Sequence, residues 1–267
     1  LRFRHADDRE VWVSLNVSFF SEGLSKQRCL ILQVQDVSAR RQAESRLQFI
    51  AYHDGLTGLP NRGHFLEQLS RAIAVAKRHP QRRFAVLFLD FDRFKLINDT
   101  LGHRVGDEFL VTIARRLQGN LRPGDLVARL GGDEFAILVQ DARSDDELVA
   151  LANRLQAIIS QPIQLADSDV TASASIGITT SELGYDLPEQ ALRDADLAMY
   201  KAKALGKARH AVFDSTMHAQ VSTRLWMENE LRRALQQREL QLHYQPIYDL
   251  RTRQLCGMEA LSRWSHP

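Results

Sequence analysis

Four acidic side chains near the middle of the sequence have the types and spacing of a metal-dependent phosphoryl-transfer site. Asp90 and Asp92 alternate with apolar neighbours at the end of an apolar segment, and Asp133 and Glu134 directly follow two glycines. Alternate residues of a strand point to the same side of the sheet, so the first two carboxylates share one face. Acids brought together repel one another, and a divalent cation offsets that repulsion. We therefore predict a site for Mg²⁺, which prefers oxygen ligands from a few carboxylates and from substrate phosphates.

Lysines in three places would complete such a site. Lys95 follows the acidic strand end, whereas Lys203 and Lys207 are four residues apart in a predicted helix and so share one helix face. Their ammonium groups can neutralise phosphate oxygens, which together with metal-binding acids equips a protein for phosphoryl or nucleotidyl transfer. Taken alone, two glycines followed by two acids are equally compatible with an ordinary exposed turn.

The elements that must position these residues alternate between strands and helices. A helical pattern follows the strand that ends at Phe91 and continues through Leu96, and further helices are predicted over 62–78, 107–117, 145–160 and 188–205. Strands are predicted over 84–91, 126–130, 134–139 and 172–178. The first of these strands is almost wholly apolar, which is typical of a strand covered on both faces. Gly131 and Gly132 permit a tight hairpin between the next two, and the whole pattern predicts an α/β sandwich.

The bulk composition excludes some partners and compartments. The chain has 267 residues, 44% of them hydrophobic, which is enough for a real core. With 35 basic and 33 acidic side chains the formal net charge is +2, so the overall field favours neither nucleic acid nor an anionic membrane. The two cysteines lack a metal or redox spacing and fit a reducing compartment. We expect these residues to be cytoplasmic and to belong to a longer polypeptide, with any inner-membrane anchor outside them.

Five ordered motifs make residues 54–214 resemble a GGDEF domain, the catalytic domain of diguanylate cyclases. They are 54–62 (DGLTGLPNR), 89–99 (LDFDRFKLIND) with 102–103 (GH) and 106–107 (GD), 128–135 (ARLGGDEF), 174–178 (ASIGI) and 195–203 (ADLAMYKAK). Chance agreement of all five is negligible. The resemblance implies a nucleotidyl-cyclase-like sheet flanked by helices.

The resemblance also implies a role for each motif residue. Asp90, the backbone carbonyl of Phe91 and Asp133 would bind Mg²⁺, with Mn²⁺ as an alternative, and Glu134 and Lys95 would be catalytic. The substrate-binding residues would be Asn98, His103, Asp107, Lys203 and Lys207. Lys207 stands where many relatives have arginine, so we expect weaker GTP binding because a bidentate contact is lost. A loop-capping role is an equally good interpretation of His103.

A diguanylate cyclase joins two GTP molecules into cyclic di-GMP, with release of pyrophosphate. Each domain would hold one GTP, so the resemblance implies a homodimer that brings two sites together. Arg122 and Asp125 match the RxxD site at which the product inhibits such enzymes, and Arg154 would add to it. A local surface ion pair is the alternative interpretation.

Both flanks resemble parts of other signalling domains. Residues 1–37 resemble the C-terminal part of a PAS sensor, and residues 38–53 its signalling helix, which is either a two-stranded coil or a plain core helix. After a linker helix over 215–237, residues 238–267 resemble the start of an EAL phosphodiesterase. Its metal or product contacts would be Gln245, Glu259, Leu261 and Arg263. An alternative function is a catalytically silent module that binds GTP or cyclic di-GMP and controls that phosphodiesterase, but the intact acids favour the cyclase.

Overall fold

The structure is a computed structural model that describes residues 2–4, 7–8, 10–22, 27–165, 168–217, 233–235, 237 and 239–264. Contacts divide the chain into two units, Leu1–Ala211 and Val212–Pro267. Most of the helix predicted over 215–237 lies outside the described residues. Within the described ranges, no helix is both long and apolar enough to cross a membrane.

A five-stranded sheet organises the larger unit, in the order β10-β9-β4-β6-β5. Its strands are β4 (Phe84–Asp92), β5 (Leu126–Gly131), β6 (Glu134–Gln140), β9 (Ser173–Thr180) and β10 (His210–Val212). The pairs β4–β6, β4–β9 and β5–β6 are antiparallel. Two short strands, β7 (Ile163–Leu165) and β8 (Ser168–Val170), form a separate antiparallel pair. A 3₁₀ helix, η2 (Ser181–Leu183), directly follows β9.

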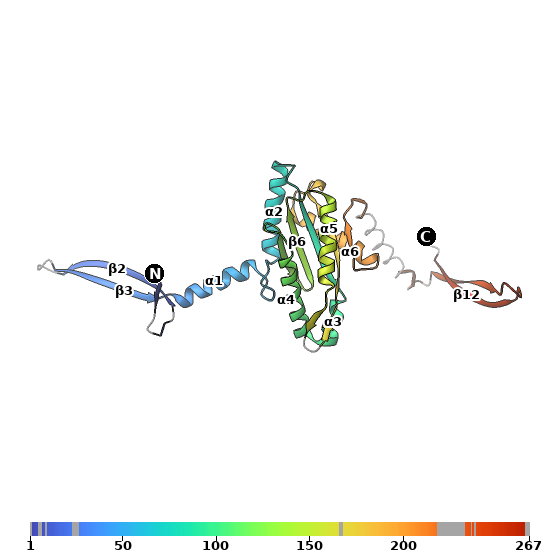
Figure 1. Ribbon diagram of the computed structural model, residues 1–267, viewed down its shortest axis with the longest axis horizontal. Helices are drawn as coiled ribbons and strands as arrows, with labels where there is room; N and C mark the ends of the chain where they lie inside the picture. Colours follow the sequence, from blue (N-terminus) through green and yellow to red (C-terminus); the bar gives the residue numbers. More distant parts are fainter. Residues whose placement is uncertain are drawn as a thin grey trace. The chain divides into compact units, whose positions relative to one another are not determined.

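Helices cover both faces of this sheet (Figure 1). They are α2 (Arg62–Arg78), α3 (Phe94–Leu101), α4 (His103–Gly119), α5 (Asp145–Ile159) and α6 (Pro188–Ala204). One core joins α3, α4 and α5 to one face of the sheet, and a second core joins α2 and α6 to the other. β4 contributes alternate residues to the two cores, so the prediction of an α/β sandwich with a doubly covered strand is confirmed.

Local sequence explains where most of these helices begin and end. The side chain of Asn61 accepts a hydrogen bond from the His64 amide at 3.0 Å and so caps α2, as Ser144 caps α5. Gly102, at φ 86°, separates α3 from α4. As a result α4 begins at His103, earlier than the predicted start at Asp107.

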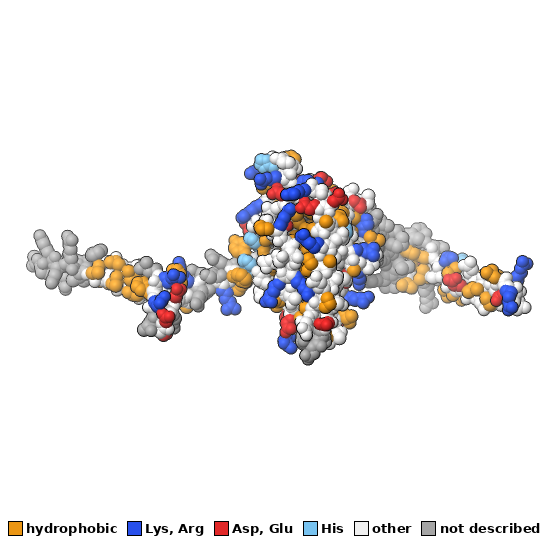
Figure 2. Space-filling view, in the orientation of Figure 1, with side chains coloured by type: hydrophobic (Ala, Val, Ile, Leu, Met, Phe, Trp, Pro, Cys, Tyr) orange, Lys and Arg blue, Asp and Glu red, His pale blue; other side chains and the backbone are white. Residues whose placement is uncertain are grey.

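The N-terminal part of the larger unit is a three-stranded antiparallel sheet of β1 (Arg2–Arg4), β2 (Glu10–Glu22) and β3 (Gln27–Asp36), followed by α1 (Ser38–Tyr52). The Trp12 amide donates to Ser38 Oγ at 2.8 Å, and the Arg41 guanidinium lies 4.1 Å from the centroid of the Trp12 ring. Exposed hydrophobic side chains lie along this sheet and along α1, as the orange atoms in Figure 2 show. The PAS resemblance stays a prediction.

In the smaller unit, β11 (Leu240–Tyr248) and β12 (Leu255–Trp264) form an antiparallel pair. The strands place Gln245 opposite Glu259, and Leu261 and Arg263 follow Glu259 at alternate positions. All four residues therefore share one face of the pair. Their predicted contacts to metal or product stay predictions.

Candidate active site

The ends of two buried strands bring the central acids together. Asp90 on β4 lies directly opposite Glu134 on β6, and on its other side it lies opposite Ser175 on β9. The Asp90 side chain is only 14% exposed. Because strand pairing fixes this register, the two carboxylates are positioned by the backbone of the sheet itself.

Two glycines shape the hairpin between β5 and β6. Gly131 has φ 148° and Gly132 has φ 52°, and a bulge interrupts the pairing just before them. A side chain at Gly132 would be strained in this left-handed conformation. The turn leaves Asp133 at the tip, next to Glu134 at the start of β6.

Electrostatics distinguish these acids from ordinary surface carboxylates. Burial raises the pKa of Asp90, and the negative charges of Asp133 and Asp92 add to this effect, although Lys203 opposes it. Burial also raises the pKa of Glu134, with further contributions from Asp196, Asp90 and Asp133. The carboxylates are thus close enough to repel one another, as the sequence predicts.

Lys203 and Asp196 reach this cluster from α6. Lys203 Nζ lies 2.6 Å from Asp90 Oδ1. Desolvation raises the pKa of Asp196, whereas the nearby Lys203 lowers it. Sequence reasoning missed Asp196, although it precedes Lys203 by seven residues, about two helical turns, and so lies on the same face of α6.

The structure contradicts two sequence-based expectations at the edge of this cluster. Lys207 does not share a helix face with Lys203, because α6 ends at Ala204 and Lys207 lies in the following loop at φ 63°. Asp92 is not available to a ligand in the way that Asp90 is. Its carboxylate accepts hydrogen bonds from Ser173 Oγ (2.7 Å), Ser175 Oγ (2.9 Å) and the Ala208 amide (3.0 Å). It therefore ties β9 and the loop after α6 to β4.

The predicted guanine-binding residues meet where α3 packs on α4. A Cβ atom at Gly106 would overlap Asn98 Oδ1 and lie 3.0 Å from Asn98 Cγ, so the Asn98 amide lies against the backbone that leads into Asp107. His103 is exposed at the first position of α4. Lys95 is exposed on α3, and no ion pair within the described ranges joins it to the acids.

An arginine that sequence reasoning did not single out links the first motif to the hairpin. Arg129 Nη1 lies 3.0 Å from Asp54 Oδ1, and Arg129 Nε and Nη2 donate to the Gly132 carbonyl at 3.0 and 2.8 Å. Both side chains of the pair are largely buried, 11% and 22% exposed. Burial acts to raise the pKa of Asp54, but hydrogen bonds from Thr57 and Arg129 outweigh it and hold that pKa below its usual value. The ion pair therefore fixes the turn that carries Asp133.

Arg129→Ala should destabilise the fold and misplace the hairpin. We expect a loss of about 1.5–3 kcal/mol in the free energy of unfolding, because the charge of Asp54 loses its partner. A small displacement of the acidic cluster should also lower the rate of the nucleotidyl transfer predicted from the sequence by about tenfold or more. Urea denaturation and product formation measure the two effects. Arg129→Lys keeps the charge but not both sets of contacts, so its stability and rate should lie between those of the wild type and Arg129→Ala. A rate equal to the wild type in both variants would contradict this role.

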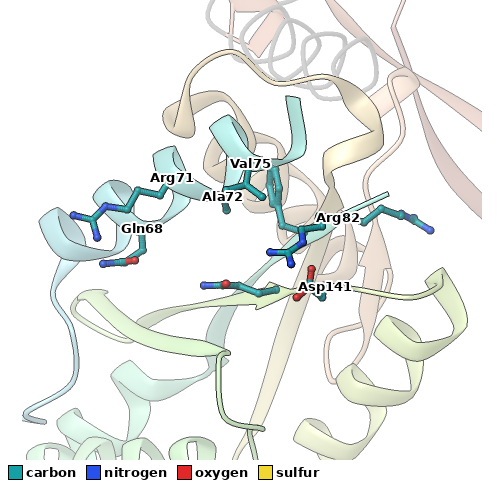
Figure 3. Close-up of a pocket in the computed structure, with 9 residues that line it drawn as sticks. Gln68, Arg71, Ala72, Val75, Arg82 and Asp141 are labelled. Carbon is teal, nitrogen blue, oxygen red and sulfur yellow. The ribbon is translucent and has the colours of Figure 1, made fainter. Parts of the chain in front are cut away.

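The residues of the predicted inhibitory site lie at the far end of β6. Arg122 Nε lies 3.4 Å from Asp125, whose pKa is raised by burial although the Gln140 amide and Arg122 oppose the shift. Arg154 does not join them by any described contact; its guanidinium donates to the Asn120 carbonyl at 3.0 Å. A hollow of about 260 Å³ adjoins the same strand end (Figure 3). It is lined by Gln68, Arg71, Ala72, Val75, Arg82, Arg83, Phe84, Gln140 and Asp141.

Comparison with known families identifies the larger part of the chain. Residues 51–209 match the family described as diguanylate cyclase, GGDEF domain. The chain belongs to this family. Residues 228–267 of the same GGDEF protein match the EAL domain family.

Relatives of the GGDEF domain agree in sequence and in fold. The chain is 43% identical over 226 residues to the bifunctional diguanylate cyclase/cyclic di-GMP phosphodiesterase MucR of Pseudomonas aeruginosa, covering 85% of this chain and 33% of MucR. A solved structure of the GGDEF domain of TpbB, from the same species, shares 45% identity with a TM-score of 0.61 and covers 64% of this chain and 99% of that one. DgcB of Caulobacter crescentus, solved in complex with cyclic di-GMP, has a TM-score of 0.60 at 26% identity, covering 66% and 93%. The chain spans about a third of the length of the curated relatives it matches first.

Proposed function

We propose that the GGDEF domain condenses two GTP molecules into cyclic di-GMP. The observation that carries this proposal is the register pair of Asp90 and Glu134, with Asp133 at the adjacent glycine turn and Lys203 2.6 Å from Asp90. In the reaction, the ribose 3′-oxygen of each GTP attacks the α-phosphorus of the other, and two pyrophosphate molecules leave.

Each predicted residue has a role that its chemistry supports. Glu134 takes the proton of the 3′-hydroxyl, for which its raised pKa makes it a better base. Asn98 and Asp107 read guanine, because an amide and a carboxylate together satisfy its acceptors and donors. The phosphates are bound by Lys95, Lys203 and Lys207, with His103 nearby. Lys203 exchanges its bond to Asp90 for phosphate oxygens when substrate arrives.

The donor set fits Mg²⁺ or Mn²⁺. Among the described residues no group of three or more His, Cys, Asp or Glu side chains forms a protein-only metal site. Mg²⁺ rarely uses one, since it binds through one or two carboxylates and keeps waters and substrate phosphates. Held by Asp90, the Phe91 carbonyl and Asp133, the cation would supply positive charge to the phosphate oxygens.

We further propose that the active form is a homodimer, because one domain offers one substrate site and each GTP must attack another. An apolar stripe on α1 supports pairing of two chains through this helix, since Leu47 is 68% and Ile50 56% exposed. Buried apolar area is the main source of stability in such helix pairs.

The test is incubation of the full chain with GTP and Mg²⁺, with an enzyme that removes cyclic di-GMP present to relieve inhibition. Pyrophosphate release is expected with that enzyme present and cyclic di-GMP formation without it, with a specific rate that rises with protein concentration as dimers form. GTP binding without pyrophosphate release at any concentration would instead favour the silent regulatory module.

Arg122→Ala should raise the steady-state level of cyclic di-GMP, because we propose that product binds at Arg122 and Asp125 and arrests the enzyme. A guanidinium binds phosphate through charge-assisted hydrogen bonds, so its loss should weaken inhibition by about tenfold or more. The measurement is the product concentration at half-maximal inhibition. An unchanged value would count against the site.

We propose the domain limits 1–37 (PAS-like), 38–53 (signalling helix), 54–214 (GGDEF), 215–237 (linker) and 238–267 (start of EAL). MucR is named as a bifunctional cyclase and phosphodiesterase. By that likeness, a polypeptide that contains this chain and the remaining EAL residues would also hydrolyse cyclic di-GMP, with Gln245, Glu259, Leu261 and Arg263 at its site.

A further inference from the structure

A second carboxylate, which the RxxD pattern does not contain, already holds Arg122. Arg122 Nη1 lies 2.9 Å from Glu147 Oε1, closer than the 3.4 Å between Arg122 Nε and Asp125. The other oxygen of Glu147 accepts the Arg143 amide at 2.8 Å. This bond, helped by Arg122, keeps the pKa of Glu147 below its usual value. The carboxylate in front of Arg122 is therefore ionised at neutral pH.

The start of α5 keeps Glu147 in this place. Glu147 is the third residue of the helix, and its amide donates to the N-cap Ser144 at 3.2 Å. A negative charge in the first turn is favoured by the helix dipole. The backbone of Glu147 is thus fixed by its own helix, and its carboxylate is held by the Arg143 amide as well as by Arg122.

The other terminal nitrogen of Arg122 is also occupied. Its Nη2 donates to the carbonyls of Gln140 and Asp141 at 2.7 and 3.4 Å, at the strand end beside the hollow in Figure 3. A phosphodiester bound by Arg122 needs the same guanidinium N–H groups and carries the same charge as Glu147. Of the groups that hold Arg122, Glu147 combines a flexible side chain with a negative charge that would repel phosphate. It must therefore move before phosphate can bind.

We propose that Glu147 masks Arg122 and thereby sets the strength of product feedback: an anionic phosphodiester such as cyclic di-GMP binds only by displacing it. The inference rests on the proposed inhibitory role of Arg122 and Asp125. Glu147 acts through Arg122 and is a positioning residue.

Calorimetric titration of the full chain with cyclic di-GMP, without GTP or divalent cations, tests the proposal. Glu147→Gln keeps the side-chain length and an acceptor for the Arg143 amide but removes the charge. It should tighten binding by roughly two- to fivefold, the strength of a partly exposed ion pair. Asp146→Asn removes a charge from the same helical turn at the exposed neighbouring residue and should leave affinity unchanged. In the Arg122→Ala background, Glu147→Gln should have no further effect.

The outcomes distinguish the masking by Glu147 from the proposed inhibitory site at Arg122 and Asp125. If Arg122→Ala abolishes binding while Glu147→Gln leaves it unchanged or weaker, masking is wrong and the inhibitory site stands. Equal tightening by Glu147→Gln and Asp146→Asn would also overturn masking, because a long-range charge effect would explain both. If Arg122→Ala binds as the wild type does, the inhibitory site itself falls. Thermal denaturation checks that each variant is folded. If Glu147→Gln unfolds, Glu147→Asp replaces it: this variant withdraws the carboxylate by one methylene and should also tighten binding.

Discussion

Glu134→Gln should lower the rate of cyclic di-GMP formation by about 10²- to 10⁴-fold, the usual contribution of a positioned general base. The amide is nearly isosteric with the carboxylate, and its position at the start of β6 is set by pairing with β4. The fold should therefore be kept. The measurement is the single-turnover rate of pyrophosphate release at saturating GTP and Mg²⁺.

GTP affinity should change little in this variant, because Asn98 and Asp107 lie on α3 and α4. Glu189→Gln, at an exposed position in the first turn of α6, is the matched control and should retain the wild-type rate. A rate for Glu134→Gln within a few-fold of the wild type would remove Glu134 from the mechanism. A loss of GTP binding would show that its role is in assembling the site.

Gly177→Ala should destabilise the domain by about 1–3 kcal/mol or more, the cost of forcing atoms into a packed interior. A Cβ atom at this position of β9 would overlap the Ala195 carbonyl oxygen and the Met199 amide nitrogen, and would lie 2.9 Å from the Ala198 carbonyl carbon. These are backbone atoms of α6, which cannot move aside as a flexible side chain would. The whole helix would have to shift, and Lys203 would move with it.

Gly119→Ala provides the control for this prediction. Gly119 is the last residue of α4, and a Cβ atom there meets nothing within 4 Å. Alanine at such a helical position should be neutral or stabilising by up to about 1 kcal/mol. Urea denaturation of both variants measures the difference. Equal midpoints would mean that α6 does not press on β9 as described.

The sequence predicts the regular elements well because most of them bury a continuous stripe. The helices over 62–78 and 145–160 and the strand over 84–91 appear within one or two residues of their predicted limits. Three-residue strands such as β7 and β10 were not predicted, since so few residues show no alternation. The early start of α4 depends on the positive φ of Gly102, which a pattern of apolar residues does not record.

The candidate site was predictable where its acids lie at the ends of recognisable strands, and less so where a side-chain contact joins motifs with no strand pattern between them. The opposed pair of Asp90 and Glu134 follows from two strand ends. The bond between Arg129 and Asp54 joins residues far apart in the chain, and neither neighbourhood signals it. Asp92 resembles a metal ligand in type and spacing, but only the fold shows that Ser175 already occupies its carboxylate.

The burial of β4 on both faces also bears on how ligands would be bound. Asp90 and Glu134 belong to strands packed between two helical layers, so the backbone that carries them is fixed before anything arrives. A cation or nucleotide would then pay little conformational entropy for arranging them. Preorganisation of this kind makes metal affinity depend mainly on charge, whereas the exposed Lys95 and His103 must lose rotamer freedom on each binding event.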